Sequence, residues 1–190
     1  MEPITFSEAA KKVRKGEAGV IPTDTLYGLV ASAMDSAAVE KVYRIRSREN
    51  GKPCIVLLSD TSDLGRFGIV PNDGMLRTLG SVWPGEVSVV LPHDRKEWSH
   101  LHRGTGTIAF RVPKNADLRG FLREAGPVVA PSANPAGKNP ATTVDEAVRY
   151  FGSRCGFFVD GGRLSGLPST VVRIKDGALQ VLRQGSVIFE

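Results

Sequence analysis

The sequence predicts one α/β domain built on a mixed β-sheet. Short apolar runs typical of strands alternate with amphipathic segments typical of helices along the whole chain. Near the end, two apolar runs flank an Asp-Gly turn, which predicts a hairpin and therefore antiparallel pairing in the sheet. The 190 residues contain no linker-like stretch and no internal repeat, and they suffice for one sizeable core. We therefore expect a single domain over residues 1–190.

Helices and strands alternate in the first half of the chain. Thr5 and Glu8 form a capping-box pattern that begins a short amphipathic helix, which Gly16 can end. A buried strand at residues 19–22 then leads into a threonine and aspartate loop. Apolar side chains at helical spacing predict a helix over residues 36–47. The next elements are strands at residues 54–58, 87–91 and 107–112, and an asparagine-capped helix at residues 72–80.

The second half continues this alternation and ends in the hairpin. A second capping-box pattern, Thr143 and Glu146, begins a helix that reaches about residue 150. The Asp-Gly pair at residues 176–177 joins the last two strands, because it tolerates the positive φ of tight hairpin turns. Strands are expected at residues 128–130, 157–160, 170–174 and 178–182, and a further helix at residues 115–124.

Composition excludes several classes of protein. The 21 glycines and 12 prolines are too few for a low-complexity chain, which has about 25–30% of the two together. The longest apolar runs fall far short of the ~20 residues of a membrane-spanning helix, and the N-terminus lacks the apolar stretch of a signal peptide. Cys54 and Cys155 belong to no Cys-x-x-Cys pattern, so two buried thiols are favoured over a disulfide or zinc site. We expect a soluble, cytoplasmic protein without membrane contact.

The familiar catalytic and nucleotide motifs are missing. The sequence has neither a P-loop nor a G-x-S-x-G nucleophile motif. Residues 104–109 match G-x-G-x-x-A but precede a strand, which disfavours a dinucleotide-binding turn. His93, His100 and His102 cluster near Trp98, and we expect them in a solvated loop rather than around a metal.

Polar loops that directly follow strands are candidate binding segments. They are residues 22–28, 131–135, 160–162 and 169–170. Ligands of open α/β sheets bind beyond strand ends, where hydroxyls and backbone amides can line a crevice. Each segment alone is better explained as a capped turn, because Ser, Thr, Asn and Pro favour turns. Several in one short chain favour a site.

Basic residues form the second candidate element. The net charge of +5 suits an anionic ligand such as a nucleotide or RNA. Arg44, Arg46, Arg48 and Lys52 extend from a predicted helix end into a loop, where guanidinium groups can bind a triphosphate. Complementing the helix dipole explains the same residues equally well.

Arg111 and Arg183 interrupt apolar strands. A buried arginine is costly unless it meets an anion, and Asp24, Asp160 or a bound ligand could each supply one. Strand alternation puts Thr107, Ala109 and Arg111 on one face, and Ile108, Phe110 and Val112 on the other. We expect the apolar face to enter the core and the other to line a cavity.

Seven short motifs follow one another along nearly the whole chain. They are PTDTLYGL (22–29), RIRSRENGKPCIVLL (44–58), WPGEVSVVL (83–91), IAFRVP (108–113), PSANPAGKNPATT (131–143), VDGGRLSGLPSTVV (159–172) and VLRQGSV (181–187). In this order they resemble the YrdC-like family of threonylcarbamoyl-AMP synthases, in its short single-domain form. The resemblance implies one α/β domain with a twisted mixed sheet, flanked by helices, around a basic cavity.

The resemblance also implies a reaction. ATP, L-threonine and bicarbonate or CO2 would give threonylcarbamoyl-AMP and pyrophosphate, with Mg²⁺ bridging the ATP phosphates and no metal held by the protein itself. The product would pass to a tRNA threonylcarbamoyl transferase complex, and a weak contact with tRNA is a further implied interaction. Such chemistry needs positioning and electrostatics but no protein nucleophile.

Site residues follow from the motif positions. Those that match threonine-binding positions are Thr25, Arg111, Ser132 and Ser169, and those that match ATP-binding positions are Arg48, Lys52, Thr107, Asn134, Thr142 and Arg183. Arg46 and Arg48 occupy the family's catalytic Lys-x-Arg pair, and Thr23 and Tyr27 are expected to line the same pocket. Two positions depart from the family pattern: Arg46 replaces the lysine, and Leu57 stands where some longer members have a histidine.

Two other functions remain alternatives. A non-catalytic RNA-binding module would use the basic residues, but aromatic side chains, the usual stacking platforms for bases, are only 7% of the chain. A related carbamoyltransferase domain would form a carbamoyl-adenylate from another donor. Pyrophosphate release that needs both threonine and bicarbonate would distinguish the synthase from the RNA-binding module.

Overall fold

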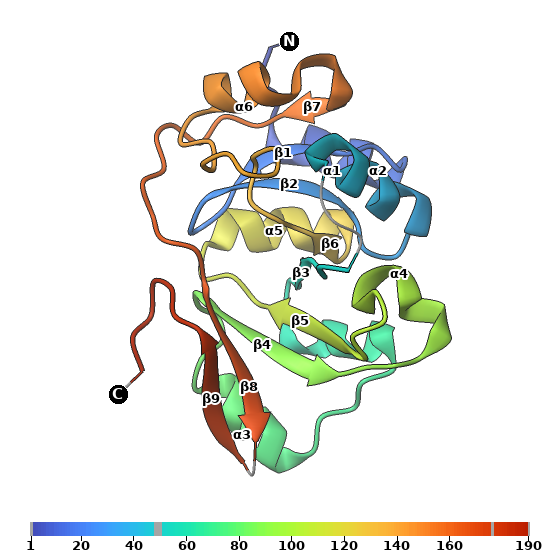
Figure 1. The fold of residues 1–190 in the computed structure, drawn as a ribbon, viewed down its shortest axis with the longest axis vertical. Coiled ribbons are helices and arrows are strands. Elements are labelled where there is room, and N and C mark those ends of the chain that lie inside the picture. The colour runs from blue at the N-terminus through green and yellow to red at the C-terminus, as the bar shows by residue number, and fades with distance from the viewer. Residues whose placement is uncertain (1, 48–50, 176, 190) are drawn as a thin grey trace.

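A mixed β-sheet forms the centre of the computed structural model, which describes residues 2–47, 51–175 and 177–189 (Figure 1). Over these residues, nine strands pair in the order β7-β1-β2-β6-β3-β5-β4-β8-β9. The strands are β1 (Gly19–Pro22), β2 (Tyr27–Ser32), β3 (Ile55–Leu57), β4 (Val87–Pro92), β5 (Thr107–Arg111), β6 (Val128–Val129), β7 (Phe157–Phe158), β8 (Thr170–Lys175) and β9 (Ala178–Arg183). The pairs β1–β7, β3–β5 and β4–β8 are parallel, and the other neighbours are antiparallel, which confirms the mixed sheet.

The five predicted helices are present, and α4 is a further helix that the sequence did not predict. They are α1 (Phe6–Arg14), α2 (Ser36–Arg46), α3 (Asp73–Gly80), α4 (Ser99–His102), α5 (Ala116–Ala125) and α6 (Val144–Phe151), with 3₁₀ turns at Thr61–Phe67, Lys96–Trp98 and Gly152–Arg154. The capping box of Thr5 and Glu8 is present. At α6, Thr143 accepts a hydrogen bond from the Glu146 backbone, but the Glu146 carboxylate binds Thr142 instead of completing the box.

Two clusters of apolar side chains cover the two faces of the sheet. The smaller cluster joins α1 and α5 to one face of the strands from β7 to β3, and Phe6 contacts Phe121 with ring centroids 5.6 Å apart. The larger cluster covers the opposite face along the whole sheet and includes α2, α6 and Phe67. Ile108, Phe110 and Val112 belong to this larger cluster, which confirms the predicted apolar face of the β5 segment.

The second strand is an element that sequence analysis missed. Residues 22–28 were expected to form a loop, but Tyr27 and Gly28 already belong to β2, and only residues 23–26 turn between β1 and β2. The apolar residues of β2 pair with β1 on one side and β6 on the other. The polar turn residues directly precede the apolar run of β2, and the sequence pattern groups the two as one loop.

Two further expectations need correction. The strand expected at residues 157–160 ends at Phe158, and residues 159–169 form an extended connection that runs along one side of the molecule from β7 to β8 (Figure 1). His93 and His102 are buried rather than solvated, with exposed fractions of 7% and 8%. Burial and the nearby positive charge of Arg95 lower the pKa of His93.

Both cysteines are free and buried, as expected. Burial raises the pKa of the Cys155 thiol to about 12, so this thiol stays protonated at neutral pH. Among the described residues, no helix has the length and apolar character needed to cross a membrane.

Candidate active site

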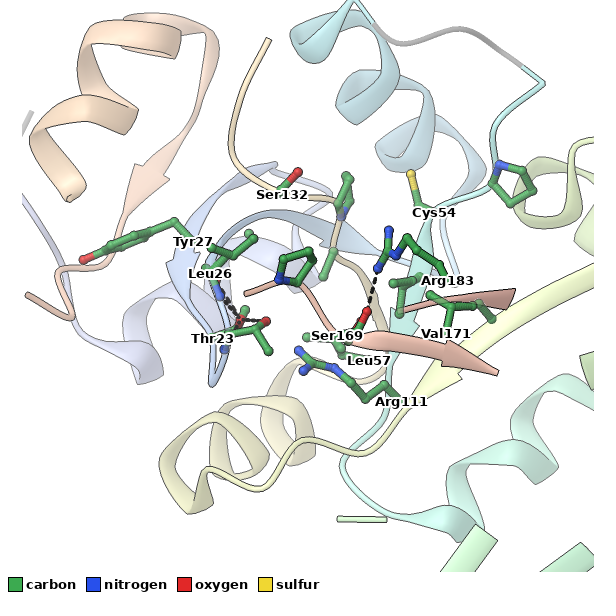
Figure 2. A pocket seen from close by; sticks show the side chains of 18 of the residues that line it. Thr23, Leu26, Tyr27, Cys54, Leu57, Arg111, Ser132, Ser169, Val171 and Arg183 are labelled. Carbon is green, nitrogen blue, oxygen red and sulfur yellow. Dashed lines mark hydrogen bonds between the residues drawn. The ribbon is translucent and has the colours of Figure 1, made fainter. Parts of the chain in front are cut away.

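A cavity of about 250 Å³ lies over the sheet face opposite the larger apolar cluster. Leu57, Ala109 and Val171 form part of its floor, because they alternate along β3, β5 and β8 with side chains that enter the core. The turn between β1 and β2, the segment after β6 and the segment before β8 complete the wall (Figure 2). Arg46, Arg111 and Arg183 reach the cavity, and no carboxylate is among its described lining residues.

The turn between β1 and β2 is held by its own hydroxyl groups. Thr23 Oγ1 donates to the Leu26 carbonyl at 2.6 Å and accepts from the backbone N–H groups of Thr25 and Leu26, both at 3.2 Å. The hydroxyls of Thr23 and Thr25 lie 3.1 Å apart. Both side chains line the cavity, as predicted, and these bonds fix the Thr25 hydroxyl there.

Arg111 is nearly fully buried and pairs with Asp24. Its Nη2 atom lies 3.0 Å from Asp24 Oδ1, and the exposed fractions of the two side chains are 4% and 8%. This settles which carboxylate meets Arg111, a choice that the sequence left open. Burial lowers the pKa of Arg111, while the charges of Asp24 and Glu86 oppose that shift. Nε and Nη1 of Arg111 are buried and have no hydrogen-bond partner.

Arg46 organises the segment that carries Ser132. Its Nε donates to the Asn134 carbonyl at 2.8 Å, and its Nη2 donates to Asn134 Oδ1 at 3.1 Å and to Ser132 Oγ at 3.5 Å. Ser132 Oγ in turn donates to Asn134 Oδ1 at 2.7 Å. Arg46 thus joins the end of α2 to the segment after β6, through several donors of one planar group.

Ser169 is positioned by a serine that sequence analysis did not select. Ser88 lies in β4 with no exposed surface, and its hydroxyl is 2.9 Å from that of Ser169. Arg183 donates from Nη2 to the Ser169 carbonyl at 2.8 Å, as Figure 2 shows. A side chain at Gly185 would collide with the Pro168 carbonyl, so glycine allows the chain after β9 to pass close to Ser169. Arg183 itself is exposed, which corrects the expectation of a second buried arginine.

Tyr27 lies at the edge of the cavity, and its ring points away from it (Figure 2). The hydroxyl donates to the Gly162 carbonyl at 2.8 Å and accepts from Gly161 N at 2.9 Å. Burial is the main cause that raises the pKa of this phenol. Tyr27 therefore anchors the connection between β7 and β8 more than it lines the pocket.

The cavity brings together one group of predicted site residues and omits another. It is lined by all four predicted threonine-binding residues and by Thr23, Tyr27, Arg46 and Arg183. Lys52, Thr107, Asn134 and Thr142 are not among its lining residues, and Arg48 lies outside the described residues. Lys52 and Thr107 are nevertheless close in sequence to the lining residues Pro53 and Ala109, whereas Thr142 binds Glu146 and Arg163.

Comparison with known proteins identifies the family. The Sua5/YciO/YrdC family model, described as "Telomere recombination", matches residues 11–185. The chain belongs to this family. A threonylcarbamoyl-AMP synthase of Bacillus subtilis is 32% identical to it over 188 residues, which cover 97% of this chain and 54% of that protein. One from Halorhodospira halophila is 29% identical over 176 residues, covering 92% of this chain and 91% of that protein.

A solved structure confirms the fold of this Sua5/YciO/YrdC-family chain. Pyrococcus abyssi Sua5 complexed with L-threonine superposes with a TM-score of 0.86 and 27% identity, covering 95% of this chain and 54% of that one. The chain thus spans about half the length of the Bacillus and Pyrococcus relatives. Among the described residues, no group of three or more His, Cys, Asp or Glu side chains is arranged to hold a metal ion.

Proposed function

We propose that the protein makes threonylcarbamoyl-AMP from L-threonine, bicarbonate or CO2, and ATP, and releases pyrophosphate. The observation that carries this proposal is the buried arginine in the floor of the cavity. Arg111 lines this cavity, and Thr25, Ser132 and Ser169 line the same space. Relatives along nearly the whole chain are named threonylcarbamoyl-AMP synthases, which supports the same function.

The cavity suits a small amino acid. Its volume of about 250 Å³ is just below the ~300–1,000 Å³ typical of pockets for larger ligands. A carboxylate placed against Arg111 would be held firmly, because hydrogen bonds between ionised groups are the strong ones. The hydroxyls of Thr25, Ser132 and Ser169 would bind the remaining polar atoms of threonine. The nucleotide would then extend from this cavity toward the segment 51–53 and Arg183.

The proposed reaction needs no protein nucleophile. The threonine amine attacks the carbon of CO2 and loses a proton, or it attacks bicarbonate, from which water leaves; both routes give the carbamate. A carbamate oxygen then attacks the α-phosphorus of ATP, the bond to the bridging oxygen of the β-phosphate breaks, and pyrophosphate leaves. Holding the reactants in line replaces covalent catalysis by the protein.

Arginines would neutralise the developing phosphate charge. Arg183 and Arg46 line the cavity, and Arg46 and Arg48 match the family's catalytic pair in sequence. Because Arg46 already binds Ser132 and Asn134, we expect it to act mainly by holding their segment in place. Mg²⁺ would enter with ATP and screen the phosphates, which fits a lining without carboxylates, since Mg²⁺ commonly keeps waters and substrate oxygens as ligands.

The product defines the place of this reaction in metabolism. Threonylcarbamoyl-AMP is an activated mixed anhydride, so it must pass to an acceptor. We propose that a tRNA threonylcarbamoyl transferase complex in the cytoplasm consumes it, with at most a weak contact between this chain and tRNA.

Mass spectrometry of the reaction product tests the proposal. The chain is incubated with ATP, MgCl₂, bicarbonate and each of a panel of amino acids that includes serine, and pyrophosphate release is followed in parallel. We expect the threonylcarbamoyl-AMP mass and pyrophosphate only when threonine and bicarbonate are both present, and neither product when EDTA is added. Pyrophosphate release without an amino acid would contradict the function, and an equal rate in EDTA would contradict the role of Mg²⁺.

A further inference from the structure

We propose that Asp24 is a positioning residue for the amino-acid substrate, whose carboxylate holds the Arg111 guanidinium in the wall of the cavity. This inference rests on the proposed function, because it concerns how the same site takes a carboxylate. It adds a residue that the motif comparison did not place among the binding residues.

Arg111 and Asp24 differ in their position relative to the cavity. Arg111 lines the cavity, whereas Asp24 is absent from the described lining residues and has an exposed side-chain fraction of 8%. Asp24 Oδ1 lies 3.0 Å from Arg111 Nη2. The carboxylate therefore meets the guanidinium away from the cavity, where it contacts no ligand itself. A buried ion pair is tolerated because each charge compensates the other.

Asp24 is itself held rigidly. Its Oδ2 atom accepts a hydrogen bond from the Lys114 backbone N–H at 2.9 Å. Its backbone belongs to the short turn that the Thr23 hydroxyl closes. The carboxylate is thus fixed between the β1–β2 turn and the segment after β5, and it can hold Arg111 in one orientation.

The orientation of Arg111 beside Asp24 leaves two of its nitrogen atoms without a hydrogen-bond partner. With Nη2 beside Asp24, the Nε and Nη1 atoms of Arg111 remain buried without a hydrogen-bond partner. Buried polar groups in native structures are usually paired, and an unpaired one is costly. A ligand carboxylate in the cavity would pair with the charge of the guanidinium, and it would do so only while the guanidinium stays in place.

Loss of the Asp24 charge would change the electrostatic surroundings of Arg111. Glu86 is the other acid whose charge acts on Arg111. It directly precedes β4 and so attracts the guanidinium from a different element. Without the Asp24 charge, the guanidinium loses the ion pair that fixes its orientation.

The test is Asp24→Asn in the full chain. Asparagine keeps the size and an oxygen for the Lys114 N–H, but it removes the charge. We expect the threonine KM to rise about ten- to a hundredfold, the range for losing hydrogen bonds to a charged group. The ATP KM should change less than about twofold, because the substitution removes no hydrogen bond to the nucleotide. Asp24→Glu keeps the charge and should show an intermediate threonine KM.

Glu40→Gln is the matched control. It breaks another ion pair, between Glu40 and Arg103 at 2.7 Å, and neither residue is among the described residues that line the cavity. Both KM values should stay at the wild-type level in this variant. A rise of the threonine KM in Glu40→Gln equal to that in Asp24→Asn would mean that any lost ion pair has this effect, and would overturn the proposal.

A nuclear magnetic resonance readout separates this inference from the proposed function. The Arg111 Nε–H signal, assigned with Arg111→Lys, should be sharp and slow to exchange in the wild type and should shift or broaden in Asp24→Asn without any substrate. A wild-type chain that releases no pyrophosphate with threonine refutes the function, and the signal then tests positioning alone. An unchanged signal together with an unchanged threonine KM overturns the positioning role. If Asp24→Asn does not fold, Asp24→Ser takes its place, because serine also removes the charge, and a wild-type threonine KM and signal there would overturn the positioning role.

Discussion

Arg111 illustrates how a strand can keep a charged side chain among apolar neighbours. Its neighbours Phe110 and Val112 enter the core, while Arg111 turns to the opposite face and meets Asp24. Burial lowers its pKa, yet the pair with Asp24 keeps the guanidinium charged at neutral pH. A substitution here therefore acts both on binding and on the stability of the fold.

Replacing Arg111 separates these two effects. Arg111→Lys keeps a positive charge for Asp24 but lacks the planar set of donors, so the threonine KM should rise at least about tenfold while the ATP KM stays nearly unchanged. Arg111→Ala leaves Asp24 buried without its cation and should lower the free energy of unfolding by about 3–5 kcal/mol. Steady-state kinetics and denaturant unfolding measure the two effects.

Arg173→Lys is the control for Arg111→Lys. Arg173 lies in the nearby strand β8, is exposed and bonds Gln180. Its replacement should leave both KM values unchanged. Equal changes of the threonine and ATP KM values in Arg111→Lys would indicate a purely structural arginine.

At the scale of elements, the connection between β7 and β8 determines where Ser169 lies. Tyr27 holds its first residues, and the Thr142 carbonyl accepts from Leu164 N at 2.8 Å farther along. A side chain at Gly166 would collide with the Thr25 carbonyl, so this segment passes directly against the β1–β2 turn. Two of the candidate hydroxyls, on Thr25 and Ser169, thereby face one cavity although they are distant in sequence.

Tyr27→Phe tests this anchoring. It leaves the Gly162 carbonyl and the Gly161 N–H without their partner, which should lower the free energy of unfolding by about 1–3 kcal/mol. Limited proteolysis should cut residues 160–169 sooner than in the wild type, because their attachment is weakened. Tyr150→Phe in α6 serves as the control and should show neither change. An unaltered cleavage pattern in Tyr27→Phe would show that the hydroxyl does not hold the connection.

At the scale of the whole molecule, the two clusters of apolar side chains leave one half of one sheet face for the cavity. Helices α1 and α5 cover the strands from β7 to β3 on that face, and the cavity follows over β3, β5 and β8. The larger cluster supports the cavity floor from the other side and reaches Trp98, whose ring lies 6.4 Å from that of His93. Buried titratable groups next to this core connect the stability of the whole fold to pH.

His93 predicts an acid-sensitive contribution to stability. Its pKa in the folded chain lies below the ordinary value of 6.5, chiefly because of burial, so the unfolded chain binds the proton more readily. The contribution is therefore fully present above about pH 6.5 and is lost as the pH falls toward the folded pKa. Denaturant unfolding between pH 5 and 8 should show a smaller loss on acidification in His93→Gln than in the wild type. An identical pH slope in His93→Gln and the wild type would refute the role of His93.

The sequence by itself determined most elements, the helix caps, the family and the face on which Arg111 lies. These features depend on neighbouring residues, through side-chain alternation, capping spacing and motif order. Only the tertiary structure decided that Asp24 rather than Asp160 meets Arg111, that Ser88 supports Ser169 from 81 positions away, and that the Tyr27 hydroxyl reaches Gly162 across 135 positions. It also decided that β2 begins at Tyr27 and that His93 and His102 are buried. The physical reason is that such contacts depend on how distant strands pair and which surfaces the helices cover, and no local pattern of residues records that arrangement.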